Sequence, residues 1–209
     1  YGMLSKQARM IENIQELANH MFYAGRLSIF EMMKIDSNKN SPANNSIFGK
    51  NVIFIECAPE ETIKTHYGEA TIAAKIASEF MKNNENDDLS IGIISPFRAQ
   101  CSLIRSMLDT YHNEKITVDT VERYQGSERD VIIISFAVNY KYQISNIQSL
   151  VENNGDLLDR KLNVALTRAK KNLIIIGSSE ILTHSPVYQK LIDYIKKNET
   201  YILMNDLQL

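Results

Sequence analysis

The stretch Asn163–Gly177, NVALTRAKKNLIIIG, decides the fold. Small and apolar residues at helical spacing fill its first half, and its second half is an apolar run with the length of a buried strand. We expect a helix over about 158–170 and a strand over 172–177. Arg168 then lies where the helix ends and the strand begins, close to the helical face of Lys161. Most arginines are surface residues, so its place beside a buried strand raises the question of its role.

Helices and strands alternate along the rest of the chain. Apolar residues at three- and four-residue spacing predict helices at 5–24, 62–82, 96–112 and around 188–195. Short apolar runs predict strands at 51–56, 90–95, 116–120 and 130–138. Two polar segments interrupt the pattern and are interpreted as a connector, 36–50, and a surface insertion, 139–156. The predicted fold class is α/β, a three-layer domain with a mainly parallel sheet and helices on both faces.

Length and composition limit the function classes. The 209 residues contain no linker rich in Pro, Gly or Ser, so we expect one domain over 1–209. A net charge of -2 gives no overall attraction to nucleic acid, which would need a local basic patch. The two cysteines and four histidines lack metal-ligand spacing, so no metal site is expected. No apolar run is long enough to cross a bilayer, and we expect a cytoplasmic monomer that binds no membrane.

Three polar segments adjoin the predicted strands, and ligands of such sheets gather at the carboxyl ends of strands. They are Pro96–Arg98, Thr120–Glu128 and Thr167–Arg168, and we expect all three to line one edge. Gly126 is interpreted either as a plain turn residue or as a point of close approach to a ligand. The planar, permanently charged fork of Arg168 suits a phosphoryl group. A G-x-x-x-x-G-K-[ST] loop is absent, so this chain does not bind ATP in the P-loop manner alone.

The motifs resemble those of a known family in order and spacing. IGIISPFRAQ (91–100), TVERYQGSERDVIIIS (120–135) and RKLNVALTRAKKNLIIIG (160–177) resemble motifs IV, V and VI of superfamily 1 helicases. The type is that of the RNA helicase of nonsense-mediated decay and its bacterial DNA-helicase relatives. LSKQARM (4–10) resembles the Q-Y-R-M segment that opens their second motor domain. The resemblance covers roughly residues 4–180.

This resemblance implies a RecA-like domain, of P-loop NTPase type, from an ATP-dependent helicase or translocase. It would be the second motor domain, and the N-terminal RecA-like domain, absent from this chain, would hold ATP and Mg²⁺. Its partner would be single-stranded nucleic acid; the resemblance favours DNA over RNA, and the sequence leaves both open. The resemblance implies that Arg168 and Arg9 are catalytic arginine fingers. It implies nucleotide contacts for Gln7, Gln125, Gly126 and Glu128. It implies nucleic-acid contacts for Ser95, Pro96 and Thr120.

Two alternatives stay open. The segment around Arg9 departs from the family pattern, with Ala8 in place of Tyr and Ile11-Glu12 in place of His-Pro. These departures favour a non-catalytic helicase-like module that binds nucleic acid or acts as a scaffold. A dinucleotide-binding enzyme of the Rossmann type is a remote alternative, because the chain has no G-x-G-x-x-G.

Overall fold

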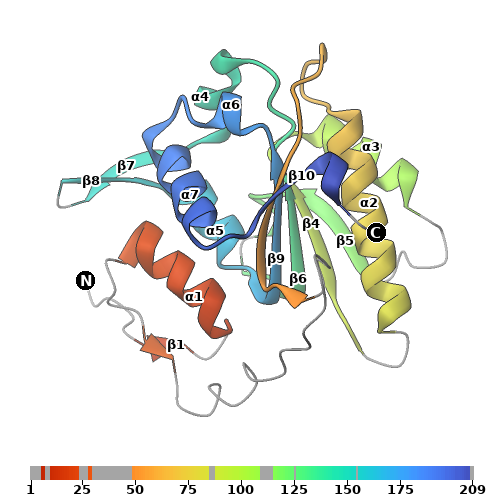
Figure 1. Cartoon of the computed structure of the whole chain (residues 1–209), viewed down its shortest axis with the longest axis horizontal. Helices are drawn as coiled ribbons and strands as arrows, with labels where there is room; N and C mark the ends of the chain where they lie inside the picture. The colour runs from red at the N-terminus through yellow and green to blue at the C-terminus, as the bar shows by residue number, and fades with distance from the viewer. Residues whose placement is uncertain are drawn as a thin grey trace.

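A six-stranded, fully parallel sheet forms the centre of the molecule (Figure 1). The computed structural model describes residues 6–7, 10–23, 28–29, 49–84, 88–108, 115–124, 126–153 and 155–207. The strand order is β10-β3-β9-β6-β4-β5. The strands are β3 (Val52–Glu56), β4 (Ile91–Ser95), β5 (Ile116–Thr120), β6 (Arg129–Ser135), β9 (Ala169–Gly177) and β10 (Tyr201–Leu203). This arrangement confirms the predicted α/β class.

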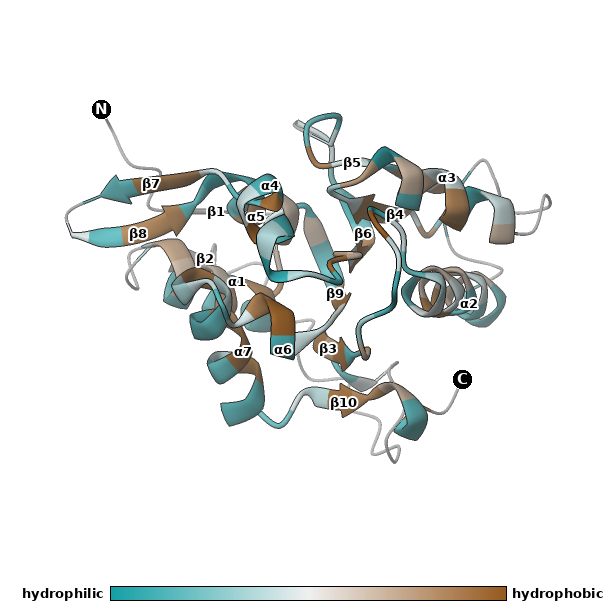
Figure 2. Ribbon diagram, turned by 90° about the horizontal axis from the view of Figure 1, so that it is seen from above, coloured by the Kyte–Doolittle hydropathy of each residue, from teal (hydrophilic) through white to brown (hydrophobic). Residues whose placement is uncertain are grey.

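Helices cover both faces of the sheet, as Figure 2 shows from above. One layer consists of α2 (Tyr67–Asn83) and α3 (Arg98–Met107). The other consists of α1 (Glu12–Ala18), α5 (Arg160–Leu166), α6 (Ser179–Leu182) and α7 (Pro186–Lys197). Side chains alternate along each strand, so β3 sends Ile53 and Ile55 into the core under α2 and α3 and Phe54 into the opposite core. Burial on both faces explains why the strands are continuous apolar runs.

Gly92 in β4 makes room for a buried tyrosine. A Cβ atom at this position would lie 2.8 Å from Cδ1 of Ile132 and 2.9 Å from Cε1 and the hydroxyl oxygen of Tyr124. Tyr124 is buried, and its hydroxyl donates to the carbonyl oxygen of Thr117. The glycine inside an apolar strand is therefore a packing requirement.

Replacing Gly92 with alanine is expected to lower the melting temperature of the chain by roughly 3–10 °C, because overpacking a core costs about 1–3 kcal/mol. Thermal unfolding followed by circular dichroism measures this. Ala99→Ser adds one atom at an exposed position of α3 and is the control. Equal melting temperatures for the two variants would contradict the packing explanation.

The N-terminal and C-terminal parts differ from the sequence prediction. The helix predicted at 5–24 is wrong in extent, since α1 begins at Glu12 and continues as a π-helical turn over Asn19–Tyr23. Lys6–Gln7 instead forms β1, which pairs in parallel with β2 (Ser28–Ile29). The edge strand β10 was not predicted, because three residues after a helix give too short an apolar pattern. Within the described residues, no helix is both long and apolar enough to span a membrane.

The segment after β6 is not simply a surface insertion. β6 ends at Ser135 rather than at residue 138, and Ala137 has a φ of 49°, which ends the extended conformation. A 3₁₀ turn, η6 (Lys141–Gln143), then leads into α4 (Ile144–Ile147), whose two isoleucines are buried in the core. The hairpin of β7 (Leu150–Asn153) and β8 (Asp156–Asp159) is the part of this segment that projects from the body (Figure 1).

Candidate functional site

The predicted site residues lie at opposite ends of the sheet. Ser95, Pro96 and Thr120 lie at the carboxyl ends of β4 and β5, where a parallel sheet collects ligands. Arg168 directly precedes β9, and Glu128 directly precedes β6, so both lie at the amino ends of these two strands. The expectation that all three segments line one edge is wrong, because the loop over 121–128 crosses from one end of the sheet to the other.

Arg168 lies in a two-residue link between helix and strand. The side chain of Asp159 accepts from the backbone N–H groups of Lys161 and Leu162 and starts α5, which ends at Leu166 with Thr167 as its cap. The predicted helix over 158–170 is therefore too long at both ends. The expectation that Lys161 and Arg168 share a helical face is also wrong, since Arg168 follows the cap.

Neutral oxygens hold the half-buried guanidinium of Arg168. Its Nε donates to the carbonyl oxygen of Val164 at 3.1 Å, Nη1 to the carbonyl oxygen of Ser127 at 3.4 Å, and Nη2 to the hydroxyl of Thr167 at 3.3 Å. These acceptors fix the plane of the fork without a formal charge of their own. These three hydrogen bonds orient the planar fork of Arg168, the side-chain geometry that suits binding of a phosphoryl group.

The loop before β6 lies against Arg168. The backbone N–H of Arg129 donates to the carbonyl oxygen of Arg168 at 3.1 Å, which ties the two strand starts together. Gly126 has a φ of 89°, and an added Cβ would meet nothing within 4 Å, so the backbone conformation alone calls for glycine. The carboxylate of Glu128 lies 3.6 Å from Nζ of Lys170. Gly126 and Glu128 therefore lie on the same side of the sheet as Arg168, and their role in binding nucleotide stays a prediction.

Three predicted residues cannot be placed in this site. Arg9 and Gln125 lie outside the described residues. Gln7 is described only through its backbone in β1. The assignments of these residues stay predictions.

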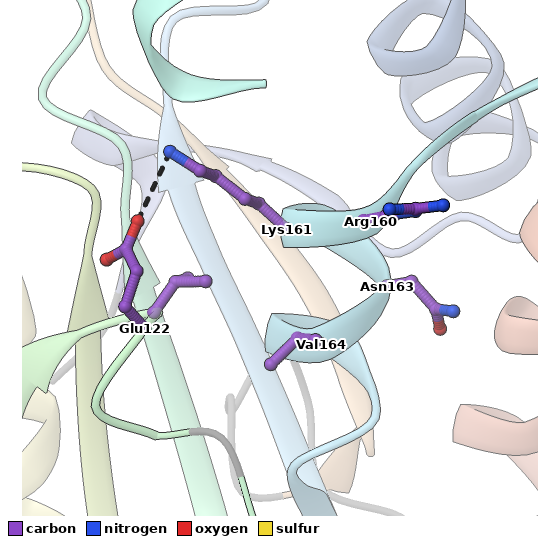
Figure 3. Close-up of a pocket in the computed structure, with 6 residues that line it drawn as sticks. Glu122, Arg160, Lys161, Asn163 and Val164 are labelled. Carbon is purple, nitrogen blue, oxygen red and sulfur yellow. Dashed lines mark ion pairs between the residues drawn. The ribbon is translucent and has the colours of Figure 1, made fainter. Parts of the chain in front are cut away.

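A cleft of about 350 Å³ lies between the start of the crossing loop and α5 (Figure 3). Lys161 extends across it toward Glu122, and their charged atoms are 3.2 Å apart. Partial burial raises the pKa of the Glu122 carboxyl, but hydrogen bonds and the charge of Lys161 outweigh burial and hold that pKa below its ordinary value. The cleft is lined by Val121, Glu122, Arg160, Lys161, Asn163 and Val164. Sequence analysis did not identify it, because the charges come from segments that meet only in the fold.

At the carboxyl ends of β4 and β5, a ligand would meet backbone groups more than the side-chain hydroxyls of Ser95 and Thr120. Ser95 is fully buried, and its hydroxyl accepts from the backbone N–H of Phe97 at 3.3 Å. Thr120 is also buried, whereas Pro96 is half-buried. The structure thus brings Ser95, Pro96 and Thr120 to one end of two adjacent strands, but it leaves little of the two hydroxyls exposed.

A buried polar network lies behind this end of the sheet. Glu69 of α2 is fully buried, and one carboxylate oxygen accepts from the hydroxyl of Ser135 at 2.8 Å and from the backbone N–H of Ala137 at 2.9 Å. Gln100 of α3 donates to the same hydroxyl and to the carbonyl oxygen of His66. Burial, opposed by these hydrogen bonds and assisted by the charge of Glu60, raises the pKa of Glu69 to about 8. Sequence analysis missed this network, since a single Glu in a helix carries no pattern.

Several known proteins have sequences similar to this chain over most of its length. Residues 1–180 match the family model described as an AAA domain. The chain is 32% identical, over 94% of its length, to the DNA replication ATP-dependent helicase/nuclease JHS1 of Arabidopsis thaliana. It is 31% identical, over 95%, to the uncharacterized ATP-dependent helicase MJ0104 of Methanocaldococcus jannaschii, and 30% identical, over 95%, to regulator of nonsense transcripts 1 of Dictyostelium discoideum. The chain belongs to the superfamily 1 helicases.

The helicase domain also has a counterpart among solved structures. It matches the C-terminal domain of a possible DNA helicase from Lactobacillus (strain WCFS1) with a TM-score of 0.51 and 13% sequence identity, over 95% of this chain and 99% of that one. This likeness supports the fold alone. The family inferred from the motifs is confirmed, and the chain is a C-terminal RecA-like domain of ATP-dependent helicase type. It spans 15–30% of the length of the three curated relatives named above.

Proposed function

We propose that this helicase domain is the second motor domain of an ATP-driven translocase and supplies Arg168 as an arginine finger. The finger would act on the γ-phosphate of ATP that a P-loop domain, separate from these 209 residues, binds together with Mg²⁺. The observation that carries this proposal is the guanidinium of Arg168, which three neutral oxygens orient at the amino ends of β6 and β9. An oriented fork stabilises the charge that spreads over the phosphoryl oxygens during transfer.

The nucleic-acid track is proposed at the opposite end of the sheet. Pro96 and the backbone around Ser95 and Thr120 lie at adjacent strand ends there, and contacts from such groups to phosphates carry no sequence information. This suits a motor that moves along any single strand. We propose DNA as the strand, since several of the relatives are named DNA helicases.

A non-catalytic scaffold is the second candidate. It is favoured by the departures from the family pattern beside Arg9, at Ala8 and at Ile11-Glu12. The two candidates differ in ATP hydrolysis: a motor hydrolyses ATP when a single strand is bound, whereas a scaffold binds the strand and hydrolyses no ATP.

The chain by itself is expected to hydrolyse no ATP and to bind single strands weakly, with affinity that falls steeply as salt rises. Joined to its P-loop domain, it should show ATPase activity stimulated by a single strand. The measurement is phosphate release with oligothymidylate and oligouridylate compared side by side, for the chain alone and for the two-domain protein. Robust ATP hydrolysis by the chain alone, or no ATP hydrolysis by the two-domain protein, would contradict the motor proposal.

A further inference from the structure

Two stacked tyrosines are exposed at the same end of the sheet as the proposed track. The rings of Tyr140 and Tyr142 are nearly parallel, with an interplanar angle of 13° and centroids 5.6 Å apart. Tyr140 is 37% exposed and Tyr142 is 59% exposed. An aromatic pair of this kind within a single turn, largely open to solvent, is not explained by the core.

Two buried polar side chains, Asn139 and Gln143, hold this turn. The side-chain oxygen of Gln143 accepts from the backbone N–H groups of Asn139 and Tyr140, each at 2.8 Å. The side-chain nitrogen of Asn139 donates to the carbonyl oxygens of Thr62 and Thr65 in the loop after β3. Both Asn139 and Gln143 are buried. These hydrogen bonds fix the backbone that carries the two rings. Binding of a ligand to the rings therefore costs little conformational entropy in this turn.

The tyrosine pair continues the line of the proposed track. The carboxyl ends of β5, β4 and β6 are neighbours in the sheet and lie about 5 Å apart. Thr120 ends β5, Ser95 ends β4, and the tyrosines follow the end of β6. The turn that carries Tyr140 and Tyr142 is bonded to the loop after β3, so a strand that crosses the sheet from Thr120 past Pro96 and continues toward β3 runs toward this turn.

The chemistry of this surface suits nucleobases. Every base has an aromatic face that stacks on a tyrosine ring regardless of sequence. Lys141, between the two tyrosines, is exposed, as is Lys64 in the contacting loop, and each supplies a cation for a backbone phosphate. Two further exposed apolar side chains, Ile63 and Tyr67, lie on or next to that loop.

We infer that Tyr140 and Tyr142 form a stacking platform for a base of the single strand as it leaves the backbone contacts at β4 and β5. Tyr142, the more exposed ring, takes the base on its open face and extends the existing stack. The inference rests on the proposed nucleic-acid function and assigns to it a site that no motif of the family covers. It explains why a polar segment following β6 places two aromatic rings in solvent.

The test uses tryptophan as a reporter, because the chain contains none. Tyr142→Trp keeps an aromatic ring at the platform and introduces a single fluorophore. Leu157→Trp, at an exposed position of the projecting hairpin, is the matched control. Each variant is titrated in about 20 mM salt, where phosphate contacts are strongest, with an oligothymidylate of about 15 nucleotides and with an abasic strand of equal length. Fluorescence anisotropy of labelled strands reports binding independently.

We expect the base-bearing strand to quench the emission of the Tyr142→Trp variant, the abasic strand to leave it unchanged, and the control to respond to neither. Tyr142→Ala should weaken binding of the oligothymidylate at least about fivefold and leave the abasic strand unaffected.

Other outcomes separate the two proposals. If strands bind but the Tyr142→Trp emission stays constant, or if both strands quench it equally, the platform is refuted and the track stands. If Tyr142→Ala binds the strand as tightly as the original chain, the platform is refuted and the exposed rings are left as a protein-docking surface. If no strand binds at any concentration reached, both the platform and the nucleic-acid function fall.

Discussion

Arg168→Ala is expected to reduce the ATPase rate of the two-domain protein by about 10³- to 10⁵-fold, which corresponds to about 4–7 kcal/mol of activation free energy. The reason is that the guanidinium is needed when negative charge spreads over the transferred phosphoryl oxygens. Affinities for ATP and for a single strand should change little. Steady-state turnover, nucleotide binding and strand binding are measured on the same preparations.

The hydrogen bonds of Arg168 set the expected structural effect of this substitution. Loss of the hydrogen bonds to Val164, Ser127 and Thr167 should cost about 1–2 kcal/mol, because hydrogen bonds of a half-buried side chain contribute modestly to stability. Arg168→Lys keeps the charge but not the planar fork and should rescue poorly.

The control for this experiment is the neighbouring Lys170→Ala. Lys170 pairs with Glu128 at the surface, and its loss should change the rate less than about threefold. If Arg168→Ala changes the ATPase rate as little as Lys170→Ala does, Arg168 is not an arginine finger. If the melting temperature falls together with the activity, the role of Arg168 is structural.

Glu69→Gln is expected to stabilise the chain above pH 8 and to remove much of the pH dependence of its unfolding. Glu69 is fully buried and its pKa is about 8 in the folded chain, against an ordinary value of 4.5. The folded state therefore binds the proton more tightly, and stability from this group falls as pH rises from 4.5 to 8. The full difference is on the order of 5 kcal/mol, a large part of the stability of an ordinary domain.

Glutamine preserves the contacts while removing the charge. Its amide oxygen can still accept from Ser135 and from the backbone N–H of Ala137, and its nitrogen takes the place of Oε1, a buried atom without a hydrogen-bond partner among the described residues. Urea unfolding of both proteins at pH 5 and pH 8.5 measures the change. Glu79→Gln, at a more exposed position of the same helix, serves as control. Parallel pH profiles for the original chain and Glu69→Gln would show that Glu69 is not the buried titrating group.

The sequence by itself determined the class of the fold and the family. Continuous apolar runs such as NLIIIG are typical of strands covered on both faces, and their alternation with helical patterns predicted a three-layer domain. The three motifs, conspicuous in order and spacing, identified the helicase family. Helix ends were predicted less well, because the side chain of Asp159 and the register of β9 against β6, rather than local periodicity, decide where α5 begins and ends.

Only the tertiary structure decided which residues work together. Arg168 and Thr120 were expected to share an edge. Thr120 ends β5 and Arg168 precedes β9, and because these strands are parallel, the end of one and the start of the other lie at opposite ends of the sheet. The pairing of Glu122 with Lys161, the burial of Glu69 and the turn that exposes Tyr140 and Tyr142 all join segments far apart in sequence. Such contacts depend on strand order and register, and no local pattern of residues encodes either.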